Sequence, residues 1–362
     1  MTEFLSPIPR KARLIAFYLP QYHPIAENDA WWGAGFTEWT NTAKARPLFR
    51  GHVQPHLPRD LGFYDLRLPE TREQQAVMAR RHGIEAFCYY HYWFAGRQVL
   101  ERPFRDVLAH GKPDLPFCLC WANETWSGIW HGAPKRVLIE QTYPGDADTE
   151  AHFETLLPAF RDPRYVRVGG KPLFLVYNPG ALPDPAGTAR LWRELSKRAG
   201  LGGLCLVGSG DQRYFDPRAN GFDAAFKTNL PNVRPYIPWR QPLRRLRHRW
   251  QQWAGKPTIF DYRETARGLI PDPFPSDHYP VAIPNWDNTP RSGVRGRVLH
   301  ASHPEYFRPH LARAVAAVSG RPGDERIVFV KSWNEWAEGN YLEPDLEFGS
   351  KWLEVVDEET RA

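Results

Sequence analysis

The sequence predicts a (β/α)8 barrel, a single domain over residues 1–362 with elaborated loops, and three observations lead to this fold class. Short apolar runs alternate with stretches of helical periodicity along the chain. Polar and aromatic side chains follow directly after the clearest apolar runs, on the face where barrel enzymes build their active sites. The first run ends in Tyr18-Leu-Pro-Gln-Tyr22 and not in the glycine-rich turn expected of a doubly wound nucleotide-binding sheet, the main alternative.

Apolar runs give the expected strands and periodic stretches the expected helices. The strands are expected at Leu14–Leu19, Ile84–Tyr90, Phe117–Cys120, Leu173–Val176, Leu204–Val207, Asp223–Phe226, Val281–Ile283 and Ile327–Val330. The helices are expected at Glu70–His82, Pro103–Ala109, Thr149–Phe160, Thr188–Ala199 and Glu305–Val318. The loops between these elements are long, and the chain's 35 prolines indicate that they are ordered.

One segment, Asn229–Lys256, interrupts the alternation and predicts a basic amphipathic helix inserted in the barrel. Leu243, Leu246, Trp250 and Trp253 recur there at helical spacing, opposite the arginines Arg240, Arg244, Arg245, Arg247 and Arg249. We expect this helix to pack on the side of the barrel with a solvated basic face. The alternative is that Arg240–Arg249 contacts an anionic membrane surface or a lipid-linked glycan.

Charge and cysteine content bound the partners and the compartment. The net charge is +6 and its excess lies in the insertion, so we expect no nucleic-acid partner. The four cysteines lie in apolar runs without a C-x-x-C pair, and we expect buried free thiols, as in a reducing compartment. Residues 1–13 lack the apolar core of a signal peptide, and no run is long enough to span a membrane. We expect a cytoplasmic protein, or one peripheral to the inner face of the membrane if the basic helix binds it.

The stretch Lys331–Gly339, directly after the last apolar run, carries the strongest chemical signal. Glu335 and Glu338 lie three residues apart, next to Trp333 and Trp336. Two carboxylates this close acquire different pKa values, so one can donate a proton while the other accepts one. Indoles provide flat apolar platforms for sugar faces. The alternative is that one glutamate pairs with an arginine or caps a helix, but the combination predicts a catalytic pair for carbohydrate chemistry.

The same stretch carries a family resemblance. Trp333-Asn-Glu-Trp-Ala-Glu-Gly339 resembles the W-N-E-W-x-E-G signature of glycoside hydrolase family 99, the endo-α-mannosidase family. Over nearly the whole chain the sequence resembles the WbsX-like proteins, a related family of surface-polysaccharide gene clusters whose members are often labelled glycosyltransferases. The further matching motifs are Phe17-Tyr-Leu-Pro-Gln-Tyr-His23, Gly35-Phe-Thr-Glu-Trp39, Pro58-Arg-Asp-Leu-Gly-Phe-Tyr-Asp-Leu66, Tyr89-Tyr-His-Tyr-Trp93 and Trp121-Ala-Asn-Glu-Thr-Trp126.

The resemblance implies roles for the two glutamates. In family 99 the first glutamate deprotonates the sugar 2-hydroxyl, which attacks the anomeric carbon to give a 1,2-anhydro sugar. The second protonates the leaving group and then activates water. Glu335 would then be the 2-hydroxyl base and Glu338 the general acid/base, unlike the usual pair in which a carboxylate is the nucleophile. The family motif typically has histidine where this chain has Ala337.

Other polar and aromatic residues at the expected strand ends are candidates for substrate binding. They are Tyr22, His23, Trp39, Asp60, Tyr64, His91, Trp93, Asn123, Glu124, Trp126, Trp286, Asn334 and Trp336. Glu124 could bind a sugar hydroxyl or tune Glu338, or it could pair with a loop arginine. Each aromatic residue could instead pack in the core. The histidines lack metal-ligand spacing, and we expect no metal and no cofactor.

Three functions fit these residues. The first is retaining glycoside hydrolysis or transglycosylation on a cell-surface polysaccharide of O-antigen or capsule type. The second is a glycosyltransferase of polysaccharide biosynthesis, although the sequence contains no D-x-D metal site and no phosphate-binding loop. The third is a glycan-binding or scaffold protein without turnover.

Overall fold

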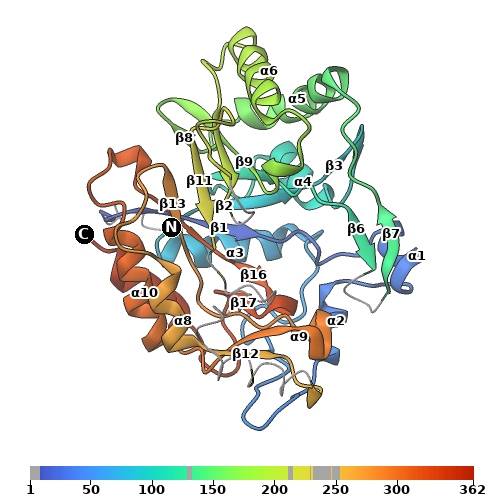
Figure 1. Ribbon diagram of the computed structural model, residues 1–362, viewed down its shortest axis with the longest axis vertical. Coiled ribbons are helices and arrows are strands. Elements are labelled where there is room, and N and C mark those ends of the chain that lie inside the picture. The colour runs from blue at the N-terminus through green and yellow to red at the C-terminus, as the bar shows by residue number, and fades with distance from the viewer. Residues whose placement is uncertain (1–8, 129–132, 211–214, 229, 231–245, 247–252) are drawn as a thin grey trace.

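The barrel is closed. The structure is a computed structural model that describes residues 9–128, 133–210, 215–228, 230, 246 and 253–362. Within these residues eight parallel strands pair around a ring, and helices surround them (Figure 1), so the predicted fold class is confirmed. The strands are β1 (Arg13–Tyr18), β2 (Ile84–His91), β5 (Phe117–Trp121), β9 (Lys171–Val176), β10 (Cys205–Ser209), β11 (Ala224–Lys227), β13 (His278–Ala282) and β15 (Ile327–Val330).

Strand pairing decides between the barrel and the open sheet. Each strand pairs in parallel with the next one in chain order, and β15 pairs back with β1 through the register Ile15 opposite Phe329. The short strand β8 (Arg167–Val168) is added antiparallel to β9. Because the ring has no free edge at β1 or β15, the doubly wound alternative is excluded.

The helices lie mostly where the periodicity predicts them. The five predicted helices are α3 (Pro69–Arg81), α4 (Arg102–His110), α5 (Asp146–Arg161), α6 (Pro185–Arg198) and α10 (Pro304–Ala316). Two further helices, α8 (Tyr262–Leu269) and α11 (Lys351–Thr360), were not predicted. Figure 1 shows α5 and α6 on one side of the barrel and α8 and α10 on another, so the strands are covered from outside. This cover explains why the strands are apolar along their whole length.

Aromatic rings fill the inside of the barrel just below its C-terminal mouth. The rings of Phe17, Phe226 and Phe329, from β1, β11 and β15, lie 5.5–5.8 Å apart. Tyr90 of β2 stacks on Phe17 at 5.5 Å. All four side chains are at least nine-tenths buried. Rings from strands that are not neighbours can meet only across the barrel interior, so this layer is the floor on which the mouth is built.

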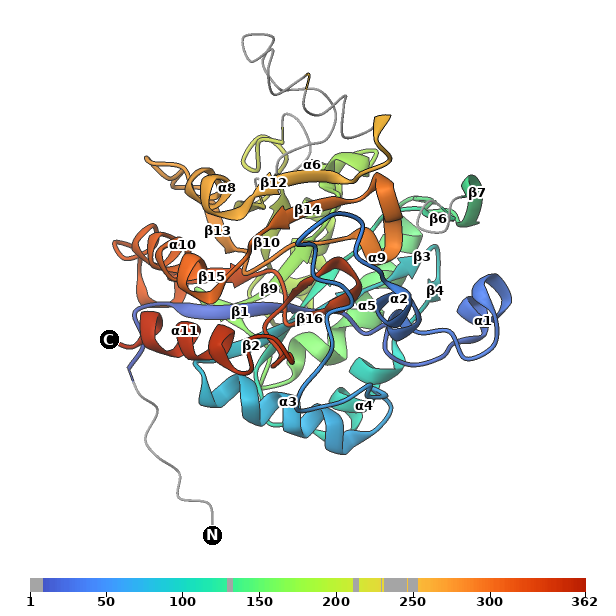
Figure 2. The ribbon, with the colours of Figure 1, turned by 90° about the horizontal axis from the view of Figure 1, so that it is seen from below.

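The loops between the barrel strands and the main helices, most of them at the mouth, contain short elements that the sequence did not predict. They are α1 (Ala26–Trp32), α2 (Glu38–Lys44), β3 (Trp93–Phe94), β4 (Arg97–Gln98), β6 (Trp126–Gly128), β7 (Ala133–Ile139), η2 (Pro179–Ala181), β12 (Thr258–Asp261), α9 (Thr289–Ser292), η3 (Gly293–Arg295), β14 (Arg297–His300), η4 (Gly323–Glu325), β16 (Asn334–Glu335), η5 (Trp336–Glu338) and β17 (Asn340–Tyr341). Figure 2 shows α1 and the β6–β7 hairpin together at one end of the molecule. The rings of Trp31 and Trp126 join them, 6.0 Å apart.

The basic helix predicted within Asn229–Lys256 lies outside the described residues, apart from Leu230, Leu246 and residues 253–256. The same holds for Arg240–Arg249 except Leu246. The four cysteines are described, and all are buried free thiols, as predicted. In the described part of the chain, no helix combines the length and the apolar character that crossing a bilayer requires.

Gly339 sets the exit of the loop that carries the two glutamates, and we predict that Gly339→Ala lowers the free energy of unfolding by about 2–4 kcal/mol. Its φ is +56°, and an added Cβ would lie 2.8 Å from the backbone nitrogen of Asp287. The matched control is Gly320→Ala, whose Cβ would meet nothing within 4 Å and should change stability by at most about 0.5 kcal/mol. Urea unfolding of both variants measures this, and equal losses would contradict the steric argument.

Candidate active site

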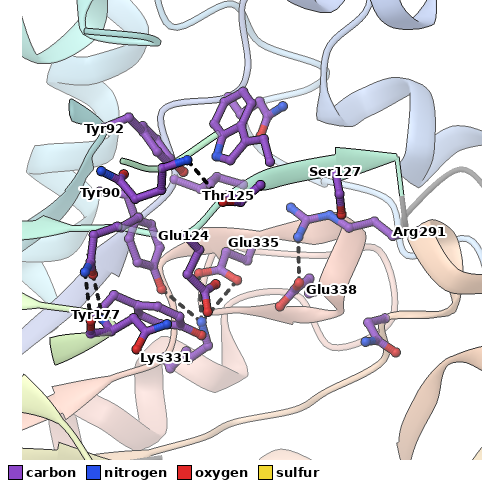
Figure 3. A pocket seen from close by; sticks show the side chains of 18 of the residues that line it. Tyr90, Tyr92, Glu124, Thr125, Ser127, Tyr177, Arg291, Lys331, Glu335 and Glu338 are labelled. Carbon is purple, nitrogen blue, oxygen red and sulfur yellow. Dashed lines mark hydrogen bonds and ion pairs between the residues drawn. The ribbon is translucent and has the colours of Figure 1, made fainter. Parts of the chain in front are cut away.

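The two glutamates lie on a return loop that folds back over the barrel mouth. After β15 the chain forms the antiparallel pair β16 and β17, joined by the 3₁₀ turn η5. The peptide bond between Lys331 and Ser332 is cis. Glu335 ends β16 and Glu338 ends η5, so the expected turn brings both side chains to one cavity. Figure 3 shows their carboxylates pointing into the same part of it, together with that of Glu124.

Asn334 fastens this loop to the first strand. Its side-chain oxygen accepts a hydrogen bond from the backbone N–H of Leu19 at 2.8 Å, and its amide nitrogen donates to the carbonyl of Leu19 at 3.1 Å. The indole of Trp336 donates to the buried carboxylate of Glu343 at 2.7 Å. Burial raises the pKa of Glu343 to about 7, although the donors Trp336, Gln75 and Tyr64 lower it. Asn334 and Trp336 are fully buried and therefore position Glu335 from behind.

Glu335 has a lysine as its cation. Its two carboxylate oxygens lie 3.3 and 3.4 Å from Nζ of Lys331, which donates a further hydrogen bond to the hydroxyl of Tyr90 at 2.9 Å. All three side chains are more than nine-tenths buried. A charge in such a place must be paired, and Lys331 and Glu335 pair with each other.

Glu338 has an arginine as its cation, and it shares that arginine. Nη1 of Arg291 donates to Glu338 at 2.6 Å, and its Nε donates to Glu38 at 2.9 Å. Glu38 begins α2, whose start is fixed by the capping box of Thr37. Arg291 lies in α9, where Asp287 accepts from the backbone N–H of Thr289 at 2.9 Å.

Asp287 connects α9 to η5, the turn that carries Glu338. Its backbone N–H donates to the carbonyl of Glu338 at 2.7 Å. Its carboxylate binds His52 at 2.6 Å and Gln54 at 2.7 Å. Burial would raise the pKa of Asp287, but His52, Thr289 and Gln54 hold it below its usual value. The ionised Asp287 therefore fixes Glu338 and the helix of Arg291 relative to each other.

The two carboxyl groups titrate in opposite directions. Burial raises the pKa of Glu335, and the nearby Glu338 adds to this, although Lys331 and Arg291 oppose it. Burial would also raise the pKa of Glu338, but Arg291, Lys331 and the hydrogen bond from Glu335 hold it below its usual value. Like charges this close separate the pKa values of two carboxyl groups, so Glu335 binds a proton more readily than Glu338 does.

The cavity around the pair has a volume of about 1240 Å³ and aromatic walls. Of the predicted site residues, Asn123, Glu124, Trp126, Trp286, Glu335 and Glu338 line it. Burial raises the pKa of Glu124, and Lys331 partly opposes this. Among the ion pairs of the described residues, none joins Glu124 to an arginine. The amide of Asn123 donates to the hydroxyl of Tyr143 at 3.0 Å and to the carbonyl of Asn178 at 2.7 Å, so it holds the wall together.

The other predicted site residues do not line the cavity; they bond to protein groups behind or beside it. Tyr22 donates to the carbonyl of Asn334, Trp39 to that of Tyr64, and Tyr64 to Glu343. His23 contacts the carbonyl of Pro20, His91 contacts His152, Trp93 donates to Asp148, and Asp60 pairs with Arg59. Asn334 and Trp336 belong to the same buried layer. Asn334 and Trp336 support the loop that carries the two glutamates, which accounts for their place in the motif around Glu335 and Glu338.

Four residues of the site were missed in the sequence. Lys331, Arg291, Glu38 and Tyr90 line the cavity and contact the pair directly or through one partner. Lys331 had a local signal, because it follows an apolar strand and stands four residues before Glu335. Arg291 had none, since it is 47 or more positions distant in sequence from its two partners. In the described chain no three histidine, cysteine, aspartate or glutamate side chains are grouped as a metal site requires.

Comparison with known proteins identifies the family. A family model described as Glycosyltransferase WbsX matches residues 14–356. This chain belongs to the WbsX family. Two curated WbsX-like relatives, each named uncharacterized protein WxcX and taken from two strains of Xanthomonas campestris pv. campestris, are 46% identical over 351 residues. The match covers 95% of this chain and 49% of each relative, so the chain spans about half their length.

Two solved structures are similar to this chain in fold. A family 99 endo-alpha-mannosidase from Bacteroides thetaiotaomicron is similar over 96% of both chains, with a TM-score of 0.57 and 16% identity. A glycoside hydrolase-like protein is similar over 99% of this chain and 96% of its own, with a TM-score of 0.57 and 14% identity. At these identities the likeness concerns the fold. The description of the family model names a class of carbohydrate-active enzyme.

Arg291 compensates two buried carboxylates, and we predict that Arg291→Met lowers the free energy of unfolding by about 3–5 kcal/mol at neutral pH. The pKa of Glu338 is depressed in the folded protein, so its pairing with Arg291 stabilises the fold above the unfolded pKa, and this contribution is lost as pH falls below it. The difference in unfolding free energy between wild type and variant should therefore be full at neutral pH and narrow as pH falls below about 4.5.

Urea unfolding at several pH values measures this difference. The control is Arg80→Met, since Arg80 and Asp114 form an exposed pair at 3.7 Å that should contribute less than about 1 kcal/mol. A loss for Arg291→Met that does not depend on pH would contradict the electrostatic explanation.

Proposed function

We propose that this chain cleaves or transfers glycosidic bonds of a cell-surface polysaccharide, or of its precursor, through Glu335 and Glu338. The observation that carries the proposal is the buried carboxyl pair itself, whose pKa values are shifted in opposite directions and which lines an aromatic-walled cavity. A structural pair would face protein groups only, whereas both of these carboxylates reach open space. Acid and base work on a glycosidic bond needs such a pair.

The proposed chemistry uses the sugar's own 2-hydroxyl as the nucleophile. Glu335 removes the proton of the 2-hydroxyl, and its oxygen forms a bond to the anomeric carbon. The bond from that carbon to the leaving oxygen breaks as Glu338 protonates the leaving oxygen. In the second half Glu338 takes a proton from water and the water oxygen attacks the anomeric carbon. The bond between that carbon and the 2-oxygen breaks, and Glu335 returns its proton to the 2-oxygen. Two inversions retain the configuration. With a sugar hydroxyl in place of water the same steps give transfer.

Both glutamates lie on one turn, and this arrangement supports the proposed route. In the usual retaining mechanism the two carboxyl groups flank the scissile bond from opposite sides. Here Glu335 directly precedes the turn η5 and Glu338 ends it, and their side chains are close enough for a hydrogen bond between them. The proposal requires that, with a sugar bound, Glu335 is ionised and Glu338 carries the proton.

Transfer from an activated donor is the second candidate, favoured by the family's description as a glycosyltransferase.

The position of the protein in the cell is also a proposal. Buried free thiols support a cytoplasmic location. Arg240–Arg249 would then be the contact with the membrane or with a lipid-linked glycan, which sedimentation with anionic vesicles can test.

Incubation of the purified protein with polysaccharide fragments, with and without nucleotide sugars, tests the proposal. Release of reducing ends, or exchange between fragments without a donor, is the expected result. Extension of fragments only when a nucleotide sugar is present would favour the glycosyltransferase. Binding of fragments without any turnover would favour a glycan-binding scaffold and overturn the enzyme assignment.

Substitution of each glutamate separates the two roles. Glu335→Gln and Glu338→Gln should each lower kcat/KM by at least about 100-fold, since each removes a proton-transfer group. A panel of glycosyl fluorides should restore turnover in Glu338→Gln only, because fluoride leaves without needing an acid. Glu70→Gln, on the exposed side of α3, is the control and should act like wild type. Rescue of Glu335→Gln in place of Glu338→Gln would reverse the roles, and full activity of both variants would refute the pair.

A further inference from the structure

Lys331 is the first residue after β15, and its ammonium group lies where several strand ends meet. The rings of Phe17, Tyr90, Tyr177 and Trp286 surround Nζ at 5.5–6.0 Å from their centroids. These residues come from β1, from β2, and from the loops after β9 and β13. The side chain is 6% exposed and also lines the cavity. The fold thus holds a positive charge at the centre of the mouth, on the aromatic floor.

The contacts of this ammonium group are directed at Glu335. Both carboxylate oxygens lie at nearly equal distances, 3.3 and 3.4 Å, so the group bridges them. The hydroxyl of Tyr90 accepts a second hydrogen bond at 2.9 Å and fixes the ammonium from the other side. Figure 3 shows this chain of contacts from Tyr90 through Lys331 to Glu335. A lysine confined in this way also fixes the orientation of the carboxylate.

The proposed reaction needs Glu335 in its ionised form, and most of its surroundings oppose that form. Burial and the neighbouring carboxylate of Glu338 favour the neutral acid. The other charged and titratable groups that face the pair are Arg291, Glu124, Tyr90 and Tyr92, with Glu38 behind Arg291. Arg291 favours ionisation, but it contacts Glu338 and Glu38 and not Glu335. Among the groups that favour the ionised form of Glu335, Lys331 has the largest effect.

We propose that Lys331 is a positioning residue that orients Glu335 and favours its ionised form, so that Glu335 can accept the proton of the 2-hydroxyl while Glu338 carries the proton for the leaving group. This inference rests on the proposed function. Without Lys331 the proton would stay on Glu335, which could then not accept the proton of the 2-hydroxyl. The proton that the leaving group needs from Glu338 would then be held by Glu335. The alternative is that Lys331 only fills the barrel mouth or contacts the sugar directly.

The direct test is the titration of Glu335 in the intact protein by carbon-13 NMR of labelled glutamate carboxyls. The background is Glu338→Gln, where Glu335 titrates without its coupled partner, and the signal is assigned by its loss in Glu335→Gln. Adding Lys331→Met should raise the midpoint of Glu335 by at least about one pH unit, as loss of an opposite charge at this distance does. Adding Lys331→Arg should keep it within about half a unit. Lys227→Met, which removes another lysine of the cavity wall, should leave it unchanged.

Activity gives the second measurement. In the Lys331→Met single variant the acid limb of the kcat/KM profile should move to higher pH, with at least about a tenfold loss below the limb and recovery above it. A uniform loss at all pH values, or a loss in KM alone, would mean a structural role or a sugar contact and would overturn the inference. If Lys331→Met does not fold, Tyr90→Phe replaces it and should shift the midpoint in the same direction. A midpoint that does not move, or falls, also overturns the inference.

The two measurements separate the two ideas. A shifted midpoint in a protein that turns over no glycan would support the coupling and refute the proposed function. Turnover of glycan with an unshifted midpoint of Glu335 would support the proposed function and refute the role of Lys331.

Discussion

The pair of hydrogen bonds between Asn334 and the backbone of Leu19 is the contact on which the rest of the site depends. It ties the loop after the last strand to the end of the first strand, where the barrel closes. Each such bond contributes only about 1 kcal/mol net, but leaving the buried N–H and carbonyl of Leu19 without partners would cost about 1–3 kcal/mol each. The loop is therefore held in one place, and Glu335, the next residue, inherits that position.

With the loop fixed, the buried charges can be compensated by fixed partners. Burying an unpaired carboxylate is costly enough that the group would take up a proton instead. Each of the two glutamates has its own cation, but the compensation is unequal. Lys331 contacts Glu335 within the same loop, whereas Arg291 divides its donors between Glu338 and Glu38. This inequality, together with the closeness of the two carboxyls, shifts their pKa values in opposite directions.

The sequence predicted the barrel well because its evidence is local. Apolar runs and helical periodicity depend on neighbours along the chain, so the strands and five helices were found to within three residues at each end. The closeness of Glu335 and Glu338 was also a local signal, and the two side chains line one cavity. Arg291 could not be found, since only the folded loops bring α9 against η5. Buried residues such as Tyr22, Tyr64 and Asn334 were expected to bind substrate. A sequence motif does not distinguish a residue that supports the site from one that contacts the substrate.

The fate of the tryptophans shows where specificity can lie. Trp333 and Trp336, next to the glutamates in sequence, are fully buried and hold the turn, while Trp31, Trp126 and Trp286 reach the cavity from other loops. Ala337, the departure from the family 99 motif, is fully buried and does not line the cavity. The return loop carries the two glutamates, whereas α1 and the β6–β7 hairpin contribute Trp31, Trp32 and Trp126 to the cavity wall. Proteins that share the motif can keep the acid and base while their walls admit different glycans, because the two sets of residues come from separate segments.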